Sequence, residues 1–562
     1  MGEGPAGVNP SASMNFTSAR GVGSTMRAMR RLLLLIGILA CSRGARKDVS
    51  PPLAAQAPEA AAQQAALDAP PALLQPEMIE HALSRVTFGA RPQDRARLRR
   101  VGIAAFIEEQ LHPEAIDDSA LEQRLRKFEV LQKGPDELVQ KLLAQRRDRK
   151  HEQLLAQAPP PPEEESGQMI GHQMSDHLAP ARPDAVAQLA QVKLLRAVAS
   201  ARQLQEVMVD FWFNHFNVFA GKQEEAALLP DYEERALRPF ALGNFKDLLE
   251  ATAHSPAMLI YLDNWRSASP RPNQKQRGLN ENYARELLEL HTLGVDGGYT
   301  QRDIVEVARC FTGWTVDTPQ KDPRFVFRPG MHDFGRKVVL GDVIPAGGGI
   351  EDGEQVLRIL EAHPSTARFI AGKLARRFVS DDPPQSLVDR AAAEYLRTRG
   401  DVRSMLRALF ESPEFWSRRA LKAKVRSPLE LVAGAVRALD ASVDEPAALA
   451  RAVARIGEPL YAAQPPTGYP DLAQGWLSSG ALLARIDFGL QLASGQLAGV
   501  KVDLSPLSGG GPQDLLDKAA AQLGATELSQ RTRESIVQQL EEKPLPARAV
   551  GLLLGAPEMQ RR

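Results

Sequence analysis

The sequence predicts a mainly α-helical protein, with one large multi-helical globular domain and a small β-hairpin insertion. Ser-Pro pairs recur at positions 255, 412 and 427, and each places a capping serine before a proline that suits the first turn of a helix. Apolar residues also recur every three or four positions along most of the chain, as on the buried face of a helix. β-Branched and aromatic runs at about 325–340 break this pattern and predict the hairpin.

Length and charge narrow the possible classes of protein. A chain of 562 residues is longer than one ordinary core organises, so the sequence predicts a large domain with appended segments. The formal net charge is zero, which provides no long-range attraction for a polyanion. We therefore expect no nucleic-acid partner.

Residues 1–41 have the pattern of an export signal that ends at a lipid-attachment cysteine. Three arginines precede the apolar run 32–40, which is too short to span a bilayer, and a small residue stands directly before Cys41. A cysteine in the first mature position is typical of bacterial lipoproteins. The pattern predicts a lipid-anchored protein of the cell envelope, and Ser42 favours the outer membrane, facing the periplasm or the cell surface. An uncleaved anchor or a chance cysteine is the alternative.

The rest of the chain divides by composition. Residues 42–75 are rich in Ala, Pro and Gln and are predicted to form a tether. The main helical domain is expected at 76–500, with a proline-rich and acidic insert at 152–185 that is predicted to be disordered. A Gly-rich hinge precedes a C-terminal helical segment, 513–562, which we expect to pack on the main domain.

An aromatic helix is predicted within residues 203–222. Aromatic residues cover nearly every face of this segment between Phe211 and Phe219, so we expect it to be buried on most sides. Its polar residues Asn214, His215 and Asn217 must then find partners inside the protein, because an unpaired buried polar group costs a few kcal/mol.

An acidic helix is predicted to begin at Asn280 and to end at Gly294. Glu286 and Glu289 fall on a stripe beside the apolar one, and His291 follows the core-facing side. A second helix is predicted to begin at Thr300, whose hydroxyl and the Asp303 carboxylate can form a capping box.

The predicted hairpin would present a histidine and a carboxylate together. Its strands are the runs Phe325-Val-Phe and Lys337-Val-Val-Leu, and the long loop between them carries His332 and Asp333.

Several long motifs together resemble one bacterial family. They are W-F-N-H-F-N-V-F, G-L-N-E-N-Y-A-R-E-L-L-E-L-H-T-L-G-V, F-T-G-W, H-D-F-G-R-K, P-P-T-G-Y-P-D and L-L-L-G-A-P-E. In this order they resemble the domain-of-unknown-function 1800 family, over residues 76–562. The resemblance implies an exported protein and, as a partner, the product of a neighbouring sulfatase-like gene. It implies no activity, so the catalytic residues are unknown.

One candidate site follows from the residues themselves. A metal or acid/base pocket could be built from His215, Glu286, Glu289, His291, His332 and Asp333. Imidazole and carboxylate ligands suit a divalent metal such as Zn, Mn or Fe. Glu286 and His291 are five positions apart, however, and no H-E-x-x-H signature is present. The alternative is structural, with the glutamates paired to nearby arginines and the histidines satisfied in the core.

Two classes of function stay open, and whether the protein is an enzyme is not decided. In the first, an exported envelope lipoprotein acts as a binding or assembly partner. In the second, a metal-dependent hydrolase acts on an envelope polymer or ester. The sequence contains no phosphate-binding loop and no G-x-S-x-G nucleophile elbow.

Overall fold

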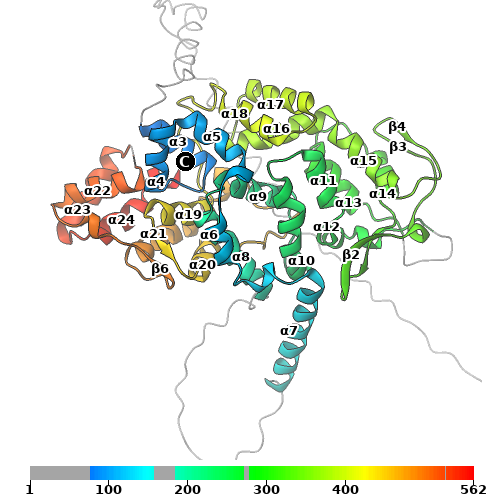
Figure 1. Ribbon diagram of the computed structural model, residues 1–562, viewed down its shortest axis with the longest axis horizontal. Helices are drawn as coiled ribbons and strands as arrows, with labels where there is room; N and C mark the ends of the chain where they lie inside the picture. Colours follow the sequence, from blue (N-terminus) through cyan, green and yellow to red (C-terminus); the bar gives the residue numbers. More distant parts are fainter. Residues whose placement is uncertain (1–75, 157–183, 271–277, 526) are drawn as a thin grey trace, which may run out of the picture. The chain divides into compact units, whose positions relative to one another are not determined.

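The computed structural model describes residues 76–156, 184–270, 278–525 and 527–562, which belong to one compact unit. The predicted signal peptide, Cys41, the tether and all but the ends of the insert lie outside these residues. The mainly α-helical prediction is confirmed, because the described residues form 22 α-helices and three two-stranded sheets (Figure 1). None of the helices in this part of the chain is long and apolar enough to cross a membrane.

The α-helices follow one another with short connections. The first group is α3 (Pro76–Val86), α4 (Pro92–Val101), α5 (Ile103–Leu111), α6 (Ser119–Leu125), α7 (Pro135–Ala156), α8 (Asp184–Ala199) and α9 (Gln203–His215). The second is α10 (Glu225–Asp231), α11 (Phe245–Ala253), α12 (Pro256–Tyr261), α13 (Asn282–Glu286), α14 (Gln301–Cys310), α15 (Glu351–Glu361), α16 (Pro364–Phe378), α17 (Gln385–Thr398) and α18 (Val402–Phe410). The third is α19 (Pro428–Ala438), α20 (Ala447–Ile456), α21 (Ser479–Ala493), α22 (Pro512–Leu523), α23 (Gln530–Glu542) and α24 (Pro546–Gly555).

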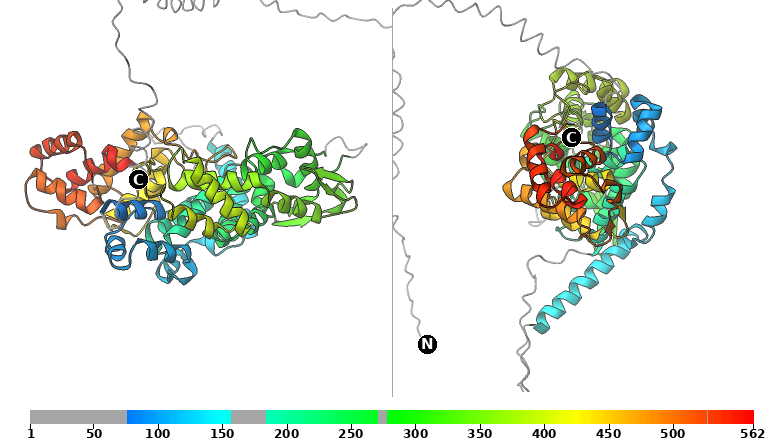
Figure 2. Two further views of the ribbon diagram at one scale, coloured as in Figure 1. Left: turned by 90° about the horizontal axis from the view of Figure 1, so that it is seen from above. Right: turned by 90° about the vertical axis from the view of Figure 1, so that its left-hand side faces the viewer.

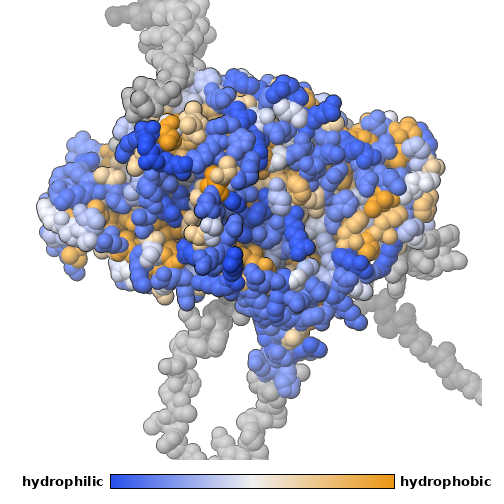
Figure 3. All heavy atoms as spheres, in the orientation of Figure 1, coloured by the Kyte–Doolittle hydropathy of each residue, from blue (hydrophilic) through white to orange (hydrophobic). Residues whose placement is uncertain are grey.

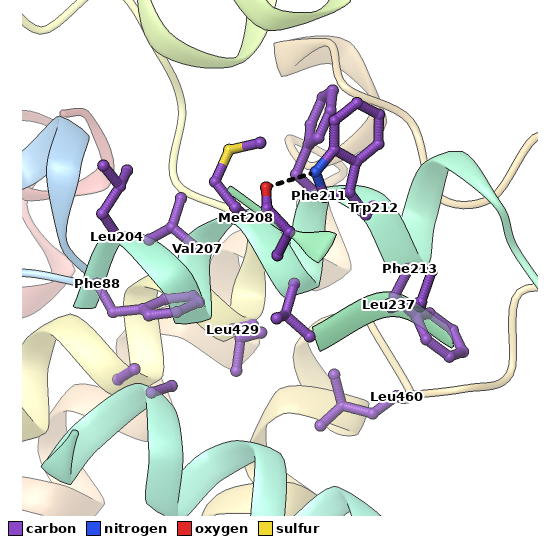
Figure 4. Packing of buried hydrophobic residues seen from close by; sticks show 14 of the residues in the cluster. Phe88, Leu204, Val207, Met208, Phe211, Trp212, Phe213, Leu237, Leu429 and Leu460 are labelled. Carbon is purple, nitrogen blue, oxygen red and sulfur yellow. Dashed lines mark hydrogen bonds between the residues drawn. The ribbon is translucent and has the colours of Figure 1, made fainter. Parts of the chain in front are cut away.

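Helix α9 lies in the core, as its aromatic sequence predicts. Phe211, Trp212 and Phe213 are all buried, and Trp212 has no exposed surface. Figure 4 shows these side chains leaving α9 in different directions, each against other parts of the core. The indole Nε1 of Trp212 donates to the carbonyl oxygen of Ala241 at 2.9 Å, so its one polar atom is satisfied.

Two π-helices adjoin α9. The acidic helix starts as α13, beside Asn280, whose Oδ1 accepts from the amide of Asn282 at 2.9 Å. It then widens into the π-helix η7 (Leu287–Thr292). The second π-helix is η4 (Tyr232–Leu237), which packs against α9. Single-turn π segments of this kind are often found at functional sites.

The capping signals of two later helices are confirmed. At α14 the Thr300 hydroxyl accepts from the Asp303 amide, and the carboxylate of Asp303 accepts from the Thr300 amide. At α19 Ser427 and Glu430 form the same reciprocal box. The Ser-Pro pair at 412 is different, because residues 411–420 form turns rather than an α-helix. Its serine Oγ instead accepts from the amide of the buried Phe415, so tertiary burial overrides the local signal there.

The β structure is confirmed in kind but differs in pairing. Strand β1 (Trp314–Thr318) pairs with β2 (Asp322–Phe327), and β3 (Lys337–Val339) pairs with β4 (Asp342–Ile344). The two predicted strand segments therefore pair with nearer neighbours and not with each other. Each neighbour follows or precedes a short turn, and the tight turn between β3 and β4 has positive φ at Leu340 and Gly341. The third sheet pairs β5 (Ser442–Val443) with β6 (Val500–Lys501).

The C-terminal helices are packed on the body of the protein. Helix α24 packs along α21, and α22 contacts α19 (Figure 2). Glycines allow the close approach of α21 and α24, because a Cβ on Gly489 would lie 3.1 Å from the carbonyl oxygen of Gly551. On the face drawn in Figure 3 the surface is mostly hydrophilic, with hydrophobic residues in smaller patches.

Candidate polar cavity and the predicted site residues

The structure brings His215 and His291 together. The Nε2 atom of His215 donates to the backbone carbonyl of His291 at 3.0 Å, and the two rings lie 6.2 Å apart between centroids. Both side chains are buried, and burial together with nearby Lys373 lowers the pKa of each ring. For His291 the pKa falls to about 3. Both imidazoles are therefore neutral at physiological pH, in an aromatic part of the core.

Glu286 and Glu289 lie on the same helix at its half-buried edge. Arg285 pairs with Glu289 at 3.5 Å and with Glu281 at 3.4 Å. Glu286 is half-buried, and burial together with the charge of Glu289 raises its pKa. The arginine pairs correspond to the structural alternative for these residues.

His332 and Asp333 belong to a different cluster. The ring of His332 uses its Nδ1 on the carbonyl of Thr312 at 2.7 Å and its Nε2 on the Asp352 carboxylate at 3.1 Å. Asp333 accepts two hydrogen bonds from Arg309, at 2.8 and 3.1 Å. Internal hydrogen bonds thus occupy both ring nitrogens of His332.

The six predicted site residues therefore fall into separate groups. The pair His215 and His291 lies beside α9, the two glutamates line the edge of their helix, and His332 and Asp333 are held by other partners. Within the described ranges, no three His, Cys, Asp or Glu side chains come together in an arrangement that could hold a metal ion.

Another set of residues meets around a cavity of about 70 Å³, here called the polar cavity. Its charged lining consists of four cations, Lys193, Arg377, Lys424 and Arg562, and four carboxyl groups, Asp210, Glu430, Glu458 and Asp471. They come from α8, α9, α16, the start of α19, the segment after α20 and the end of the chain. Residues more than 300 positions apart in sequence thus share one small space.

The asparagines of the aromatic helix build one wall of the polar cavity. Asn214 Nδ2 donates to the carbonyl of Tyr469 at 2.9 Å, and its Oδ1 accepts from the Tyr469 amide at 2.7 Å. Asn217 Nδ2 donates to the carbonyls of Ala463 and Pro465. These bonds hold the P-P-T-G-Y-P-D turn against α9 and confirm that the buried polar groups of this segment find partners.

Gly468 makes this wall possible. Its φ is +70°, in the left-handed region that favours glycine, and a Cβ at this position would lie 2.4 Å from Asn214 Oδ1. Any larger residue would displace the amide that holds the turn.

Lys193 lies at a second wall, between two aromatic rings. Its Nζ is 3.3 Å from Glu233 and 3.4 Å from Asp210, and it lies over the rings of Phe213 and Tyr461. Burial opposes its charge, but Glu233 and Asp210 outweigh burial and raise the pKa of Lys193. The ammonium therefore stays charged inside the protein.

Glu430 lies at the centre of a group of buried cations. Its carboxylate accepts from Arg562 Nε at 3.0 Å and from the Ser427 amide at 3.0 Å, and it also pairs with Arg377. Burial opposes ionisation, but Arg377 and Arg562 outweigh it and lower the pKa of Glu430 to about 2. This carboxylate is ionised at any pH at which the protein is folded.

Arg85 adds a further positive charge beside this group. It is completely buried, close enough to Arg562 and Arg377 for their charges, after burial, to lower its pKa. Its Nη2 donates to the carbonyl of Ala420, whereas its Nε and Nη1 have no hydrogen-bond partner among the described residues. None of the carboxylates in these ranges lies within 4.0 Å of its nitrogens. A buried guanidinium in this state favours an added anion or water nearby.

Two groups in the cavity wall titrate near neutral pH. Burial and the charge of Asp210 raise the pKa of Glu458 to about 8, although its carboxyl accepts from the Leu429 amide at 2.8 Å. Burial lowers the pKa of Lys424 to about 8, against the attraction of Asp381. Groups with perturbed pKa values in a shared cavity are typical of functional sites.

Comparison with known proteins gives one match. The family model described as "Protein of unknown function (DUF1800)" matches residues 81–561. The chain belongs to the DUF1800 family. This confirms the resemblance inferred from the sequence motifs. No curated protein and no solved structure gives a significant match.

Sequence reasoning missed most of the charged residues of this DUF1800 protein's cavity. It identified Asn214 and Asn217 as buried polar residues, the turn near 469 as rigid, and Glu430 only as a helix cap. Lys193, Arg377, Lys424, Glu458 and Arg562 lie in ordinary amphipathic stretches, so no local pattern distinguishes them from surface charges. The convergence of the unusual polar motifs was the only available signal.

Proposed function

We propose that this DUF1800 protein is an exported, lipid-anchored envelope protein that binds a small anionic ligand in the polar cavity. The N-terminal pattern ending at Cys41 supports the address. The observation that carries the ligand class is the completely buried Arg85, with two unpartnered nitrogens next to Arg377 and Arg562. Since Glu458 is protonated at pH 7, the cavity's four cations also outnumber its ionised carboxylates.

The size of the polar cavity limits the ligand. A buried water needs roughly 10–15 Å³ of such space, so about 70 Å³ holds a few waters or one small oxyanion or carboxylate group. A larger ligand would place only its anionic end here. Arginine forks suit such groups because they donate two parallel hydrogen bonds.

A thermal-shift titration tests the ligand class. Sodium sulfate and sodium acetate, each compared with chloride at equal ionic strength, are expected to raise the melting temperature of the purified protein in a saturable way. Arg377→Gln should remove most of this saturable rise, and the exposed Arg302→Gln should keep it. Leu460→Phe adds volume to the cavity wall without removing a charge, and it should also abolish the rise. A saturable rise that survives both cavity variants would contradict the proposal.

The anion-binding role agrees with a binding or assembly partner in the envelope. The neighbouring sulfatase-like gene product implied by the family resemblance is the candidate protein partner. Co-purification of the two proteins in the presence and absence of sulfate would test whether the cavity ligand affects their association.

A hydrolase is the second candidate, and one observation favours it. Glu458 is a protonated acid at neutral pH beside the Asp210 carboxylate, a pairing that suits general acid catalysis. This form needs no metal, whereas the metal-dependent form finds no assembled ligand set among the described residues. Hydrolysis of p-nitrophenyl acetate that Glu458→Gln abolishes and a chelator leaves unchanged would favour it. Stoichiometric metal by elemental analysis would favour the metal-dependent form.

A further inference from the structure

A second pocket, here called the terminal pocket, lies where the first described helix meets the last segments of the chain. It has a volume of about 320 Å³, more than four times that of the polar cavity. Helices α3 and α4, the segment before α19, α19 itself and the short helix Pro557–Gln560 contribute to its lining. Arg562 lines both cavities, so it forms part of the wall between them.

Most charges of the terminal pocket are already paired. Arg95 is held by Glu80 and by the carbonyl of Gln522, and Arg562 is held by Glu430. Arg426 is different: its Nε donates to the carbonyl of Arg561 at 3.2 Å, and no carboxylate of the described residues lies within 4.0 Å of it. Burial lowers the pKa of Arg426, and a half-buried cation without an ion pair favours an anionic partner.

Glycine backbone leaves space around this guanidinium. A Cβ on Gly434 would lie 3.1 Å from Arg426 Nη1 and 2.9 Å from the carbonyl of Phe88. A Cβ on Gly89 would lie 2.7 Å from the Cα of Gly434. Both glycines line the pocket, so the chain approaches closely at this wall while the Nη atoms of Arg426 keep access to the space.

The remaining lining is neutral or apolar. His81 donates from Nε2 to the carbonyl of Phe415 at 2.9 Å, and burial together with Arg85 lowers its pKa, so its ring is uncharged. Leu421, Leu523 and Met559 supply apolar surface. The carboxylates of Glu77 and Glu80, also in the wall, disfavour a ligand with several negative charges.

We infer that the terminal pocket binds an organic monoanion with an apolar body, such as a medium-chain carboxylate or an aromatic sulfonate. The anionic group pairs with Arg426, and the apolar body packs on Leu421, Leu523 and Met559. The volume falls within the range of small-molecule sites, and a few polar groups set in an apolar lining fix orientation there. This site is separate from the ligand proposed for the polar cavity.

Fluorescence titration with anilinonaphthalenesulfonate tests this inference on the folded protein. The sulfonate should bind saturably and be displaced by decanoate, and the uncharged analogue phenylnaphthylamine should bind about tenfold more weakly, since it lacks the charge-assisted bond. Arg426→Gln should weaken sulfonate binding by about the same factor. The exposed Arg100→Gln, on α4 and outside the pocket lining, is the matched control and should bind as the wild type does.

A second variant keeps the test decisive if Arg426→Gln does not fold. Ser84 lines the pocket from α3, and its hydroxyl bonds only to the His81 carbonyl one turn earlier, so Ser84→Leu fills space with little structural cost. It should abolish sulfonate binding while the melting temperature stays close to that of the wild type. Unchanged sulfonate affinity in Ser84→Leu, or equal affinity for the charged and uncharged probes, would overturn the inference.

Discussion

Single residues hold the polar cavity open in two different ways. Gly468 allows the turn to meet Asn214 by having no side chain, and Glu430 satisfies several cations by carrying one ionised carboxylate. The first is a requirement of backbone geometry, and the second is one of charge. Both can be tested by substitutions that leave the surrounding helices unchanged.

Gly468→Ala is expected to destabilise the protein by about 1–3 kcal/mol, because the methyl group combines a strained positive φ with a clash against Asn214. The matched control is Gly480→Ala in α21, where a Cβ meets open space and helix propensity predicts a small gain. Urea unfolding of both variants measures the difference. Equal free energies of unfolding for Gly468→Ala and the wild type would show that the turn relaxes freely.

Glu458 is expected to make stability fall as the pH rises. Its pKa is raised from an ordinary value near 4.5 to about 8, so between these values the unfolded chain releases a proton that the folded protein keeps. The contribution of this group is fully present below pH 4.5 and is lost as the pH approaches 8, by at most about 1.4 kcal/mol per pH unit. Lys424, with a pKa lowered to about 8, changes stability mainly above that pH.

Glu458→Gln tests this prediction, since glutamine keeps an acceptor for the Leu429 amide and removes the titration. Urea unfolding at intervals from pH 5 to 8 should show the wild type losing stability relative to the variant as the pH rises. Parallel curves across this range would place the titration elsewhere.

At the scale of secondary structure, the boundaries set by local chemistry were the most predictable. Thr300 with Asp303 and Ser427 with Glu430 form the capping boxes that their spacing predicts. The π-helix η7 was not predicted, because its register depends on what surrounds it: His215, on another helix, donates to the carbonyl of His291 within it. Pairing of the strands also depended on neighbours, and the tight turn at Leu340 and Gly341 decided it for β3.

Thr300→Ala is expected to cost about 1 kcal/mol of stability, the usual effect of losing an N-cap. Asp303 also accepts from the amide of Leu340 at 2.8 Å, so weakening the box should loosen the contact of α14 with the β3–β4 hairpin as well. Ser535→Ala, at an exposed interior position of α23, is the control and should be neutral or slightly stabilising. Amide exchange at Leu340 that does not increase in Thr300→Ala would contradict the coupling.

For the whole molecule, the proposed address depends on one cysteine outside the described residues. Cys41→Ser is expected to remove lipid labelling and to shift the protein from the membrane fraction to the soluble fraction of the envelope. Cys310 provides the matched control, because it is buried in α14 with a pKa raised by burial to about 12 and should not be modified. Membrane retention of Cys41→Ser equal to that of the wild type would contradict the lipoprotein assignment.

The sequence by itself determined the mainly α-helical class, the family, the buried character of the aromatic helix and the caps of α14 and α19. These depend on periodicity and on contacts between residues a few positions apart, which are visible in a linear pattern. The grouping of side chains was decided only by tertiary structure. Packing separated His332 and Asp333 from His215, and it brought Lys193, Glu430, Glu458 and Arg562 to one cavity, because contacts between residues hundreds of positions apart leave no local spacing to read.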